Sequence, residues 1–263
     1  MTRHYTLIGE RLNYSLSKFI HEAFYRLMKR DAVYHLTEIA PDALADTMTG
    51  LRLNYAGVNV TIPYKVDIIP FLDDITPEAQ RIGAVNTIEK QKGVWIGHNT
   101  DTAGFTAMLA YHGFTVKGRR CAILGTGGAA KAAEDAVRKM GAASVAVFSR
   151  TPEAHPGTFP YAALTEGGDL LINCTPVGMY PSCDACPIPA AVTARFDAAV
   201  DMIYNPRETV LTRHMKAGGR KAETGLFMLV KQAALAQEIW FGQPIEDQAV
   251  EYIYRRILEE SHP

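Results

Sequence analysis

The stretch that decides the fold is GRRCAILGTGGAAKAAEDAVRKMGAASVAVFSRT, residues 118–151. A continuously apolar strand, Cys121–Leu124, runs into a cluster of glycines. An alanine-rich helical segment follows and ends at Gly141, and a second apolar strand covers Ser144–Phe148. Strand, helix and strand in this order predict a βαβ unit, whose two strands are parallel.

The glycines of this unit follow the pattern G-x-G-x-x-A, from Gly125 to Ala130. Gly125 permits a tight turn, and Gly127 lets backbone N–H groups approach a pyrophosphate at the helix N-terminus. Ala130 is small enough for the helix to pack closely on the strand. The pattern alone is weak, but between a strand and a helix it predicts a dinucleotide site. The alternative is a tight turn that binds nothing.

The end of the second strand indicates which dinucleotide binds. NAD-type sites carry Asp or Glu there, about 20 residues after the glycines, for the ribose 2′-hydroxyl. Here the strand ends in Ser149-Arg150-Thr151. Because a carboxylate would repel a 2′-phosphate whereas Arg150 can bind it bidentately, we expect NADP rather than NAD. The alternative for Arg150 is a solvated loop arginine.

The residues before this unit also alternate between strand and helix patterns. Strands are expected at 4–9, 33–40 and 57–62, helices at 15–31, at 41–53, after Pro63 and at 103–112, and two strands within 83–101 joined near Lys92-Gly93. Strands separated by helices predict a mostly parallel sheet with helices on its faces.

The sheet pattern restarts in the glycine-rich unit, which predicts a domain boundary near residue 102. The fold class is therefore α/β with two domains, of which the second is a Rossmann-type dinucleotide-binding domain. Two closing helices are expected at 225–242 and 246–260. They could pack on either domain, and periodicity alone does not decide which.

Composition argues against several classes of function. The 263 residues are 48% hydrophobic and 21% charged, with a net charge of −1, which gives no reason to expect a nucleic-acid or membrane partner. Because no long apolar run and no secretory signal are visible, we expect a cytoplasmic protein. Cys183 and Cys186 form C-x-x-C, but no second ligand pair recurs at comparable spacing. We expect two incidental loop cysteines and no metal.

Short polar side chains lie beside several predicted strand ends. In strand 57–62, Asn59 and Thr61 share one face, and Lys65 follows. Similar residues occur elsewhere, namely Ser15, Ser17, Asn86, Thr87, Asn99, Thr100 and Asp101. Because ligands bind at the carboxyl ends of strands in open α/β sheets, we expect these side chains to line a site for a small polyol or hydroxy acid.

Taken in order, these motifs resemble those of the shikimate dehydrogenase family over nearly all of the chain. They are S-x-S at 15–17, N-V-T-x-P-x-K at 59–65, G-A-V-N-T at 83–87, G-x-N-T-D at 97–101, G-x-G-G-A at 125–129, S-R-T at 149–151, D-M-x-Y at 201–204 and G-x-x-M-L-V-x-Q at 225–232. The resemblance implies a two-domain enzyme that reversibly reduces 3-dehydroshikimate to shikimate with NADPH, in chorismate and aromatic amino acid biosynthesis. It also implies that the closing helices return to the first domain. That domain would then comprise 1–102 and 225–263, and the dinucleotide-binding domain 103–224.

The resemblance further implies the role of each site residue. Lys65 and Asp101 match the catalytic pair. The substrate-binding positions are matched by Ser15, Ser17, Asn59, Thr61, Asn86, Tyr204 and Gln232. The cofactor contacts are matched by Gly125, Thr126, Gly127, Gly128, Ala129, Ser149, Arg150, Thr151, Met202 and Gly225. The expected ligands are NADP and shikimate or 3-dehydroshikimate, and the expected assembly is a monomer or homodimer.

The chemistry of such a reduction agrees with this pair. A hydride that reaches a ketone carbon leaves an alkoxide, which needs a proton and is stabilised by a nearby cation. Lys65 can supply both, and Asp101 can fix its orientation and charge state. The structural alternatives are a solvated lysine at the start of a helix and an aspartate that caps the helix at 103.

Three residues around the serines depart from the family's usual pattern. Tyr14 stands where His is usual, Lys18 where Pro is usual and Glu22 where Asn is usual. A quinate/shikimate dehydrogenase, with broader substrate use or NAD use, is therefore an open alternative. A non-catalytic, ligand-sensing paralogue is another, although a pure binder would not need both Lys65 and Asp101.

Overall fold

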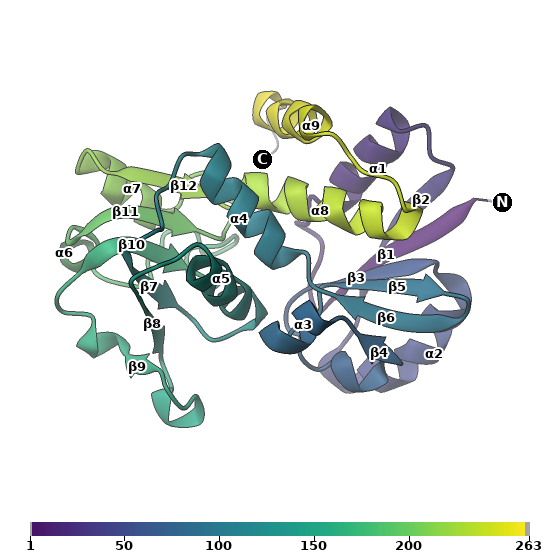
Figure 1. Ribbon diagram of the computed structural model, residues 1–263, viewed down its shortest axis with the longest axis horizontal. Helices are drawn as coiled ribbons and strands as arrows, with labels where there is room; N and C mark the ends of the chain where they lie inside the picture. The colour runs from purple at the N-terminus through teal and green to yellow at the C-terminus, as the bar shows by residue number, and fades with distance from the viewer. Residues whose placement is uncertain (1, 261–263) are drawn as a thin grey trace. The chain divides into compact units, whose positions relative to one another are not determined.

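A computed structural model describes residues 2–260, and the chain divides into two compact units (Figure 1). Unit 1 comprises Met1–Thr100 and Val230–Pro263, and unit 2 comprises Asp101–Leu229. The domain boundaries expected from the sequence, near residues 102 and 225, stay a prediction. Within residues 2–260, no helix combines the length and the apolar character needed to cross a membrane.

Unit 1 is built on a six-stranded sheet of order β2-β1-β3-β5-β6-β4. Its strands are β1 (Arg3–Gly9), β2 (Ala32–Glu38), β3 (Gly57–Val60), β4 (Asp74–Ile75), β5 (Thr87–Gln91) and β6 (Val94–His98). Neighbouring strands are parallel except that β5 is antiparallel to both β3 and β6. The β5–β6 hairpin turns at Lys92-Gly93, where both residues have positive φ, as a tight hairpin turn requires.

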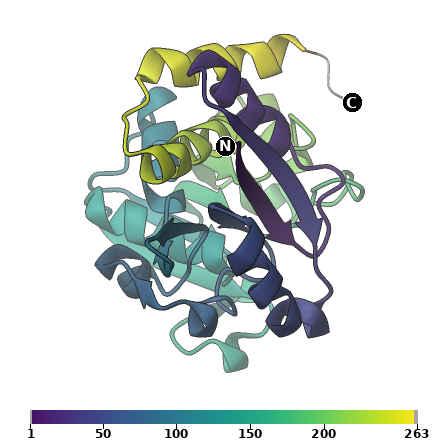
Figure 2. The same ribbon diagram turned by 90° about the vertical axis from the view of Figure 1, so that its right-hand side faces the viewer.

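Helices cover both faces of this sheet. They are α1 (Ser17–Leu27), α2 (Leu44–Asn54), α3 (Pro77–Ile82), α8 (Leu226–Phe241) and α9 (Asp247–Glu259), with short 3₁₀ helices at Pro41–Ala43 and Ile69–Phe71. On one face, Met48 and Leu51 of α2 pack with Trp95 in an apolar cluster. On the other face, Trp240 of α8 packs with Tyr5 in a second cluster. Helix α9 lies beside α1 (Figure 2).

The segment after β3 differs from its prediction in two ways. The strand ends at Val60 rather than at residue 62, because the carbonyl of Thr61 accepts the N–H of Tyr64 at 2.9 Å and closes a turn. Successive turns and the 3₁₀ helix Ile69–Phe71 follow, so the helix expected after Pro63 is wrong. Helix α3 was not predicted, although Thr76 caps it and Pro77 is its first residue.

Unit 2 is built on a fully parallel sheet of order β12-β11-β10-β7-β8-β9. Its strands are β7 (Arg120–Leu124), β8 (Ser144–Ser149), β9 (Phe159–Pro160), β10 (Gly168–Asn173), β11 (Phe196–Asp201) and β12 (Lys221–Thr224). Its helices include α4 (Asp101–Tyr111), α5 (Gly128–Lys139), α6 (Ala190–Thr193) and α7 (Val210–Ala217). Because the order reverses at β7, this is the doubly wound Rossmann topology, and the predicted fold class is confirmed.

Candidate active site

Three of the residues expected to bind substrate in unit 1, Asn59, Asn86 and Gln232, are joined by polar contacts at one edge of its sheet. Asn59 lies on β3, and its Nδ2 donates to the carbonyl of Asn86 at 3.2 Å and to Thr87 Oγ1 at 3.0 Å. Asn86 directly precedes β5, which is antiparallel to β3, so the start of β5 and the end of β3 lie at the same edge. Thr100 follows β6 and reaches the same place, because β6 is antiparallel to β5.

Asn86 is the centre of this polar edge. Its Oδ1 accepts the N–H of Thr100 at 2.8 Å, and its Nδ2 donates to Thr100 Oγ1 at 2.9 Å. The same Nδ2 lies 3.4 Å from Gln232 Oε1 on α8. With Asn86 only 2% exposed, these hydrogen bonds fix the backbone at Thr100, the residue that immediately precedes Asp101.

Lys65 is held beside this edge by its own backbone. Its carbonyl accepts the N–H of Val85 at 2.7 Å, so the turn that carries Lys65 is joined to the residue before Asn86. Thr61, at the other end of the turn, donates its N–H to Ile8 O at 2.9 Å. Lys65 is half-buried in a turn, so it is not the solvated lysine at a helix start that was the structural alternative.

The side chain of Asn59 is committed to internal hydrogen bonds. Besides its two donations near Asn86, its Oδ1 accepts the hydroxyl hydrogen of Tyr34 at 2.7 Å. Tyr34 is fully buried and stacks on His21, with ring centroids 4.1 Å apart. The geometry therefore favours a role for Asn59 in positioning Asn86, and its predicted contact with substrate stays a prediction. Tyr34 gave no sequence signal, because its contact with Asn59 spans 25 residues.

The two serines lie at the start of α1. Ser17 is the first helical residue and is buried, and its N–H donates to Ser15 Oγ at 3.2 Å. Two of the three departures from the family pattern contact each other here. Lys18 Nζ lies 3.1 Å from Glu22 Oε1, one helical turn later, and also donates to the carbonyl of Tyr34 at 2.9 Å. Lys18 and Glu22 thus neutralise each other beside the serines.

The glycine turn of unit 2 contains two glycines, Gly125 and Gly127, that are needed for different reasons. Gly125 has φ +107°, and a Cβ on it would lie 3.2 Å from Thr175 Cγ2 and 3.3 Å from the Cys174 carbonyl carbon. The fold itself therefore needs glycine at 125. Gly127 has an ordinary φ of −74°, and a Cβ on it would meet nothing within 4 Å. Among residues 2–260, no packing contact requires glycine at 127, so the open space beside it suits a ligand.

The residues around this turn fit the phosphates of a dinucleotide. Helix α5 begins at Gly128 and has no acidic residue in its first turn, so its N-terminus favours an anion. Ser149 ends β8, and its Oγ accepts the N–H of Thr151 at 3.1 Å. Arg150 is exposed between them, and its positive charge opposes the rise that burial causes in the pKa of Tyr161. Tyr161 and Arg150 are therefore neighbours, and no acid stands at the end of β8.

Asp101 is the first residue of α4 and is 3% exposed. It does not cap a helix that starts at 103, because the helix already includes it. One titratable neighbour in unit 2 is Cys174, which follows β10. Burial raises the pKa of the Cys174 thiol, and the carboxylates of Asp201 and Asp101 raise it further.

The D-M-x-Y segment is held by backbone contacts from two sides. The N–H of Met202 donates to the carbonyl of Asn173 at 2.9 Å, at the end of β10. The N–H of Gly225 donates to Ile203 O at 2.9 Å, and a Cβ on Gly225 would overlap the Met202 carbonyl. Gly225 is therefore required for close packing, whether or not it contacts a cofactor.

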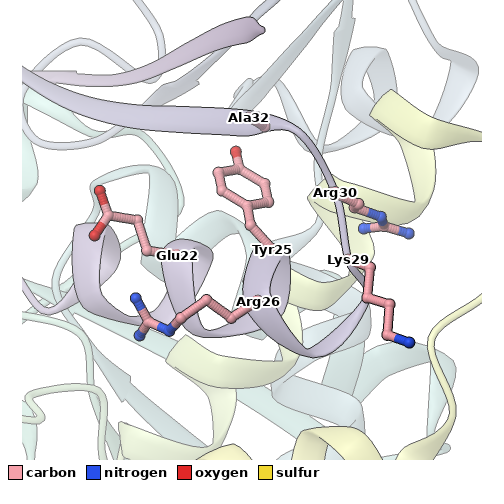
Figure 3. A pocket seen from close by; sticks show the side chains of 6 residues that line it. All are labelled: Glu22, Tyr25, Arg26, Lys29, Arg30 and Ala32. Atoms are coloured by element: carbon pink, nitrogen blue, oxygen red, sulfur yellow. The ribbon is translucent and has the colours of Figure 1, made fainter.

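A pocket of about 290 Å³ lies elsewhere in unit 1 and holds none of the predicted site residues (Figure 3). It is lined by Glu22, Tyr25, Arg26, Lys29, Arg30 and Ala32. Ala32 begins β2, so the pocket lies at the opposite edge of the sheet from Asn86. The cationic ends of Arg26, Lys29 and Arg30 point in different directions, so they do not converge on one anion.

Within residues 2–260, no group of three or more His, Cys, Asp or Glu side chains is arranged to hold a metal ion. Cys183 and Cys186 are both free thiols and partly buried. Cys186 packs against the apolar core of unit 2, which accounts for it as a structural residue.

Known proteins resemble this chain over its whole length. Residues 7–88 match the family model described as the shikimate dehydrogenase substrate binding domain. The shikimate dehydrogenase (NADP(+)) of Clostridium beijerinckii is 36% identical, with 95% of this chain and 96% of that protein covered. The crystal structure of shikimate dehydrogenase 1 from Peptoclostridium difficile is 37% identical, covers 98% of this chain and 99% of its own, and has a TM-score of 0.94. The enzyme of Thermus thermophilus, solved in complex with NADP(H) and shikimate, is 34% identical, covers 97% and 99%, and has a TM-score of 0.86.

Proposed function

The chain belongs to the shikimate dehydrogenase family, and on that premise we propose that it is an NADP-dependent oxidoreductase that reversibly reduces 3-dehydroshikimate to shikimate. The observation that carries this proposal is the buried hydrogen-bond set around Asn86. It holds the backbone of Lys65 through Val85, and it holds Thr100, the residue before Asp101. Lys65 is thus bonded through its carbonyl to the residue before Asn86, and Asp101 follows Thr100, which is bonded to Asn86.

We propose that unit 1 binds the substrate and unit 2 binds NADP. The side chains of Ser15, Ser17, Thr61, Asn86 and Gln232 belong to unit 1 and offer the short hydrogen-bonding groups that a polyhydroxylated ring needs. Tyr204 is the expected substrate contact from unit 2. In unit 2, the Gly125–Ala129 turn and the N-terminus of α5 would hold the pyrophosphate, and Arg150 the 2′-phosphate.

When bound, NADPH would supply the hydride that the ketone carbon accepts. Lys65 donates the proton that the developing alkoxide requires, and its positive charge stabilises that oxygen before the proton is transferred. Asp101 orients the ammonium group and balances its charge. In the reverse direction, Lys65 would accept the hydroxyl proton of shikimate, and the hydride from the same carbon would pass to NADP⁺.

A quinate/shikimate dehydrogenase is the second candidate, and the environment of Ser15 and Ser17 is what favours it. Tyr14, Lys18 and Glu22 replace the usual family residues there. Because Lys18 and Glu22 form an ion pair at 3.1 Å, they add no net charge beside the serines. The substitutions therefore alter the shape of this region more than its charge, and shape is what would admit or reject an additional hydroxyl.

The deciding experiment follows NADP⁺ reduction optically in the purified protein, with shikimate and quinate offered separately and NAD⁺ as the second cofactor. We expect reduction with shikimate and NADP⁺, and little with quinate or NAD⁺. Equal turnover of quinate would select the second candidate. If shikimate binds but neither cofactor is reduced, the chain is a ligand-sensing paralogue. A cytoplasmic location, a monomeric or homodimeric state and the absence of a nucleic-acid partner stay predictions.

A further inference from the structure

Unit 2 buries a carboxyl group that the proposed reaction does not use. Asp201 is the last residue of β11 and is 0% exposed. No salt bridge joins it to a basic side chain within residues 2–260. Burying a carboxylate lowers the stability of the fold unless hydrogen bonds compensate for the lost water. The donors that bind Asp201 therefore indicate its role.

Three donors satisfy Asp201, and they come from three different segments. Its Oδ1 accepts Asn173 Nδ2 at 3.0 Å, at the end of β10, and the backbone N–H of Ile203 at 3.1 Å. Its Oδ2 accepts the hydroxyl hydrogen of Thr209 at 2.8 Å. Thr209 is in turn the N-cap of α7, where its Oγ1 accepts the N–H of Thr212 at 3.3 Å. The carboxyl group therefore joins the ends of two strands to the start of a helix.

The segment that directly follows Asp201 carries Met202 and Tyr204. Asp201 fixes the N–H of Ile203, which lies between them, and Asn173 fixes the N–H of Met202 through its carbonyl. Asn173 is itself oriented on its other side, because its Oδ1 accepts both the N–H and the hydroxyl of Thr175. A change in the charge of Asp201 would thus act directly on the backbone between the expected cofactor contact and the expected substrate contact.

We propose that Asp201 is a positioning residue, whose ionised carboxylate holds the Met202–Tyr204 segment in its active conformation, and that protonation of this group produces an acid-side loss of activity. The proposal rests on the proposed function, since Met202 and Tyr204 are assigned to the site by it. Ionised oxygens accept stronger hydrogen bonds than neutral ones do. The hydrogen bonds from the Ile203 N–H and the Thr209 hydroxyl are therefore weaker when the carboxyl group is neutral.

Burial raises the pKa of Asp201 to about 7, and the hydrogen bonds from Thr209, Ile203 and Asn173 limit that rise. Two thiols lie within the electrostatic influence of its carboxylate, Cys174 after β10 and Cys186 in the segment before α6. The charge of Asp201 contributes to the raised pKa of both thiols, after the larger effect of burial. Since both thiols are neutral near pH 7, they supply no charge that could replace that of Asp201.

The first test compares pH profiles of kcat/KM for shikimate in four proteins. The wild type should lose activity as pH falls through about 7. Asp201→Asn is permanently neutral and nearly isosteric, so its profile should lack that acid limb. Its kcat/KM should not fall as pH falls through about 7, and at every pH it should stay near the low value that the wild type shows below pH 7. Thr209→Val removes a donor to the charged form and should move the limb to higher pH. Thr212→Val removes a neighbouring buried hydroxyl that does not touch Asp201, and should leave the limb in place.

The second readout does not need activity. Amide hydrogen exchange at Ile203, measured in the protein without ligands at pH 8, should be faster in Asp201→Asn than in the wild type by about tenfold, one charge-assisted hydrogen bond having become a neutral one. An unchanged limb in Asp201→Asn together with unchanged exchange at Ile203 would overturn the proposal. A wild type with no dehydrogenase activity at any pH would instead overturn the proposed function, and the exchange measurement would still decide the role of Asp201.

Discussion

Asn86 and Thr100 hold each other through two reciprocal hydrogen bonds, one from the backbone N–H of Thr100 at 2.8 Å and one to its hydroxyl at 2.9 Å. Asn86 directly precedes β5 and Thr100 follows β6, so the two hydrogen bonds join the segments that flank two antiparallel strands. This pair sets the point at which the chain leaves unit 1. The polar edge of the sheet is therefore a rigid element that the fold builds before any ligand binds.

Asn86→Ala should weaken both the fold and the activity. The change leaves the buried N–H of Thr100 without its acceptor, which costs about 1–3 kcal/mol of unfolding free energy. Chemical denaturation measures this loss, and kcat/KM for shikimate should fall as well. Asn54→Ala is the matched control, since Asn54 is exposed and donates only to Gly50 O. Equal unfolding free energies for the two variants would contradict the role given to Asn86.

Two glycines of the same turn should respond in opposite ways to alanine. Gly125→Ala places a side chain in a left-handed conformation against Thr175 and should lower the unfolding free energy by about 1–2 kcal/mol. Gly127→Ala meets no protein atom within 4 Å and has an ordinary φ, so its thermal midpoint should match the wild type. Its affinity for NADP⁺, measured by calorimetry, should fall by about tenfold or more, because the pyrophosphate needs that space. Wild-type NADP⁺ affinity in Gly127→Ala would remove the turn from the cofactor site.

Arg150 should set the preference for NADP over NAD. Arg150→Ala removes a charge-assisted contact of about 1.5–3 kcal/mol, so KM for NADP⁺ should rise by about 10- to 100-fold while KM for NAD⁺ changes little. Arg138→Ala is the control, because Arg138 is exposed in the same unit and is paired with Glu134 at 2.7 Å. A parallel rise in both KM values would show that Arg150 does not read the 2′-phosphate.

Asp201 should make the fold less stable as pH rises. Its pKa is raised from an ordinary 3.8 to about 7 in the folded state, so the folded protein retains a proton between these values that the unfolded chain has lost. The contribution of Asp201 to the unfolding free energy is therefore largest below pH 4. It decreases as pH rises from 4 to 7 and does not change above pH 7. The difference corresponds to about 4 kcal/mol.

Thermal unfolding of Asp201→Asn tests this sign. The variant and the wild type should unfold at similar temperatures near pH 4.5, and the variant should be more stable by several degrees at pH 8, where only the wild type buries a charge. A variant that is less stable at pH 8 would mean that the hydrogen bonds to the carboxylate outweigh the burial of its charge.

The local parts of this structure could be predicted from the sequence. The βαβ unit was recoverable because an apolar strand, three glycines and an alanine-rich helix follow one another without interruption. The hairpin at Lys92-Gly93 was recoverable for the same reason, since turn residues separate two alternating strands. In both places the residues that determine the turn are consecutive in the sequence. Their glycines permit the backbone conformation that the turn needs.

Some of the parts that were missed depend on contacts between distant residues, and others depend on local turns whose outcome the pattern does not decide. The hydrogen bond from Tyr34 to Asn59 and the burial of Asp201 arise only when the sheets assemble. The ion pair of Lys18 with Glu22 had a helical spacing that the sequence shows, but its significance needs the nearby Tyr34 carbonyl. The helix expected after Pro63 failed because Thr61 and Tyr64 close a turn there instead.

The central claim is that Lys65 is the proton donor and acceptor of an NADP-dependent dehydrogenase, and the rate of NADP⁺ reduction by shikimate in Lys65→Met tests it most directly. Methionine keeps the unbranched side chain and removes the charge and the proton. The account predicts that kcat falls by about 10²- to 10⁴-fold while the dissociation constant of NADP⁺ is unchanged. The exposed hairpin variant Lys92→Met should keep the wild-type kcat. A Lys65→Met enzyme with near-normal kcat would contradict the account.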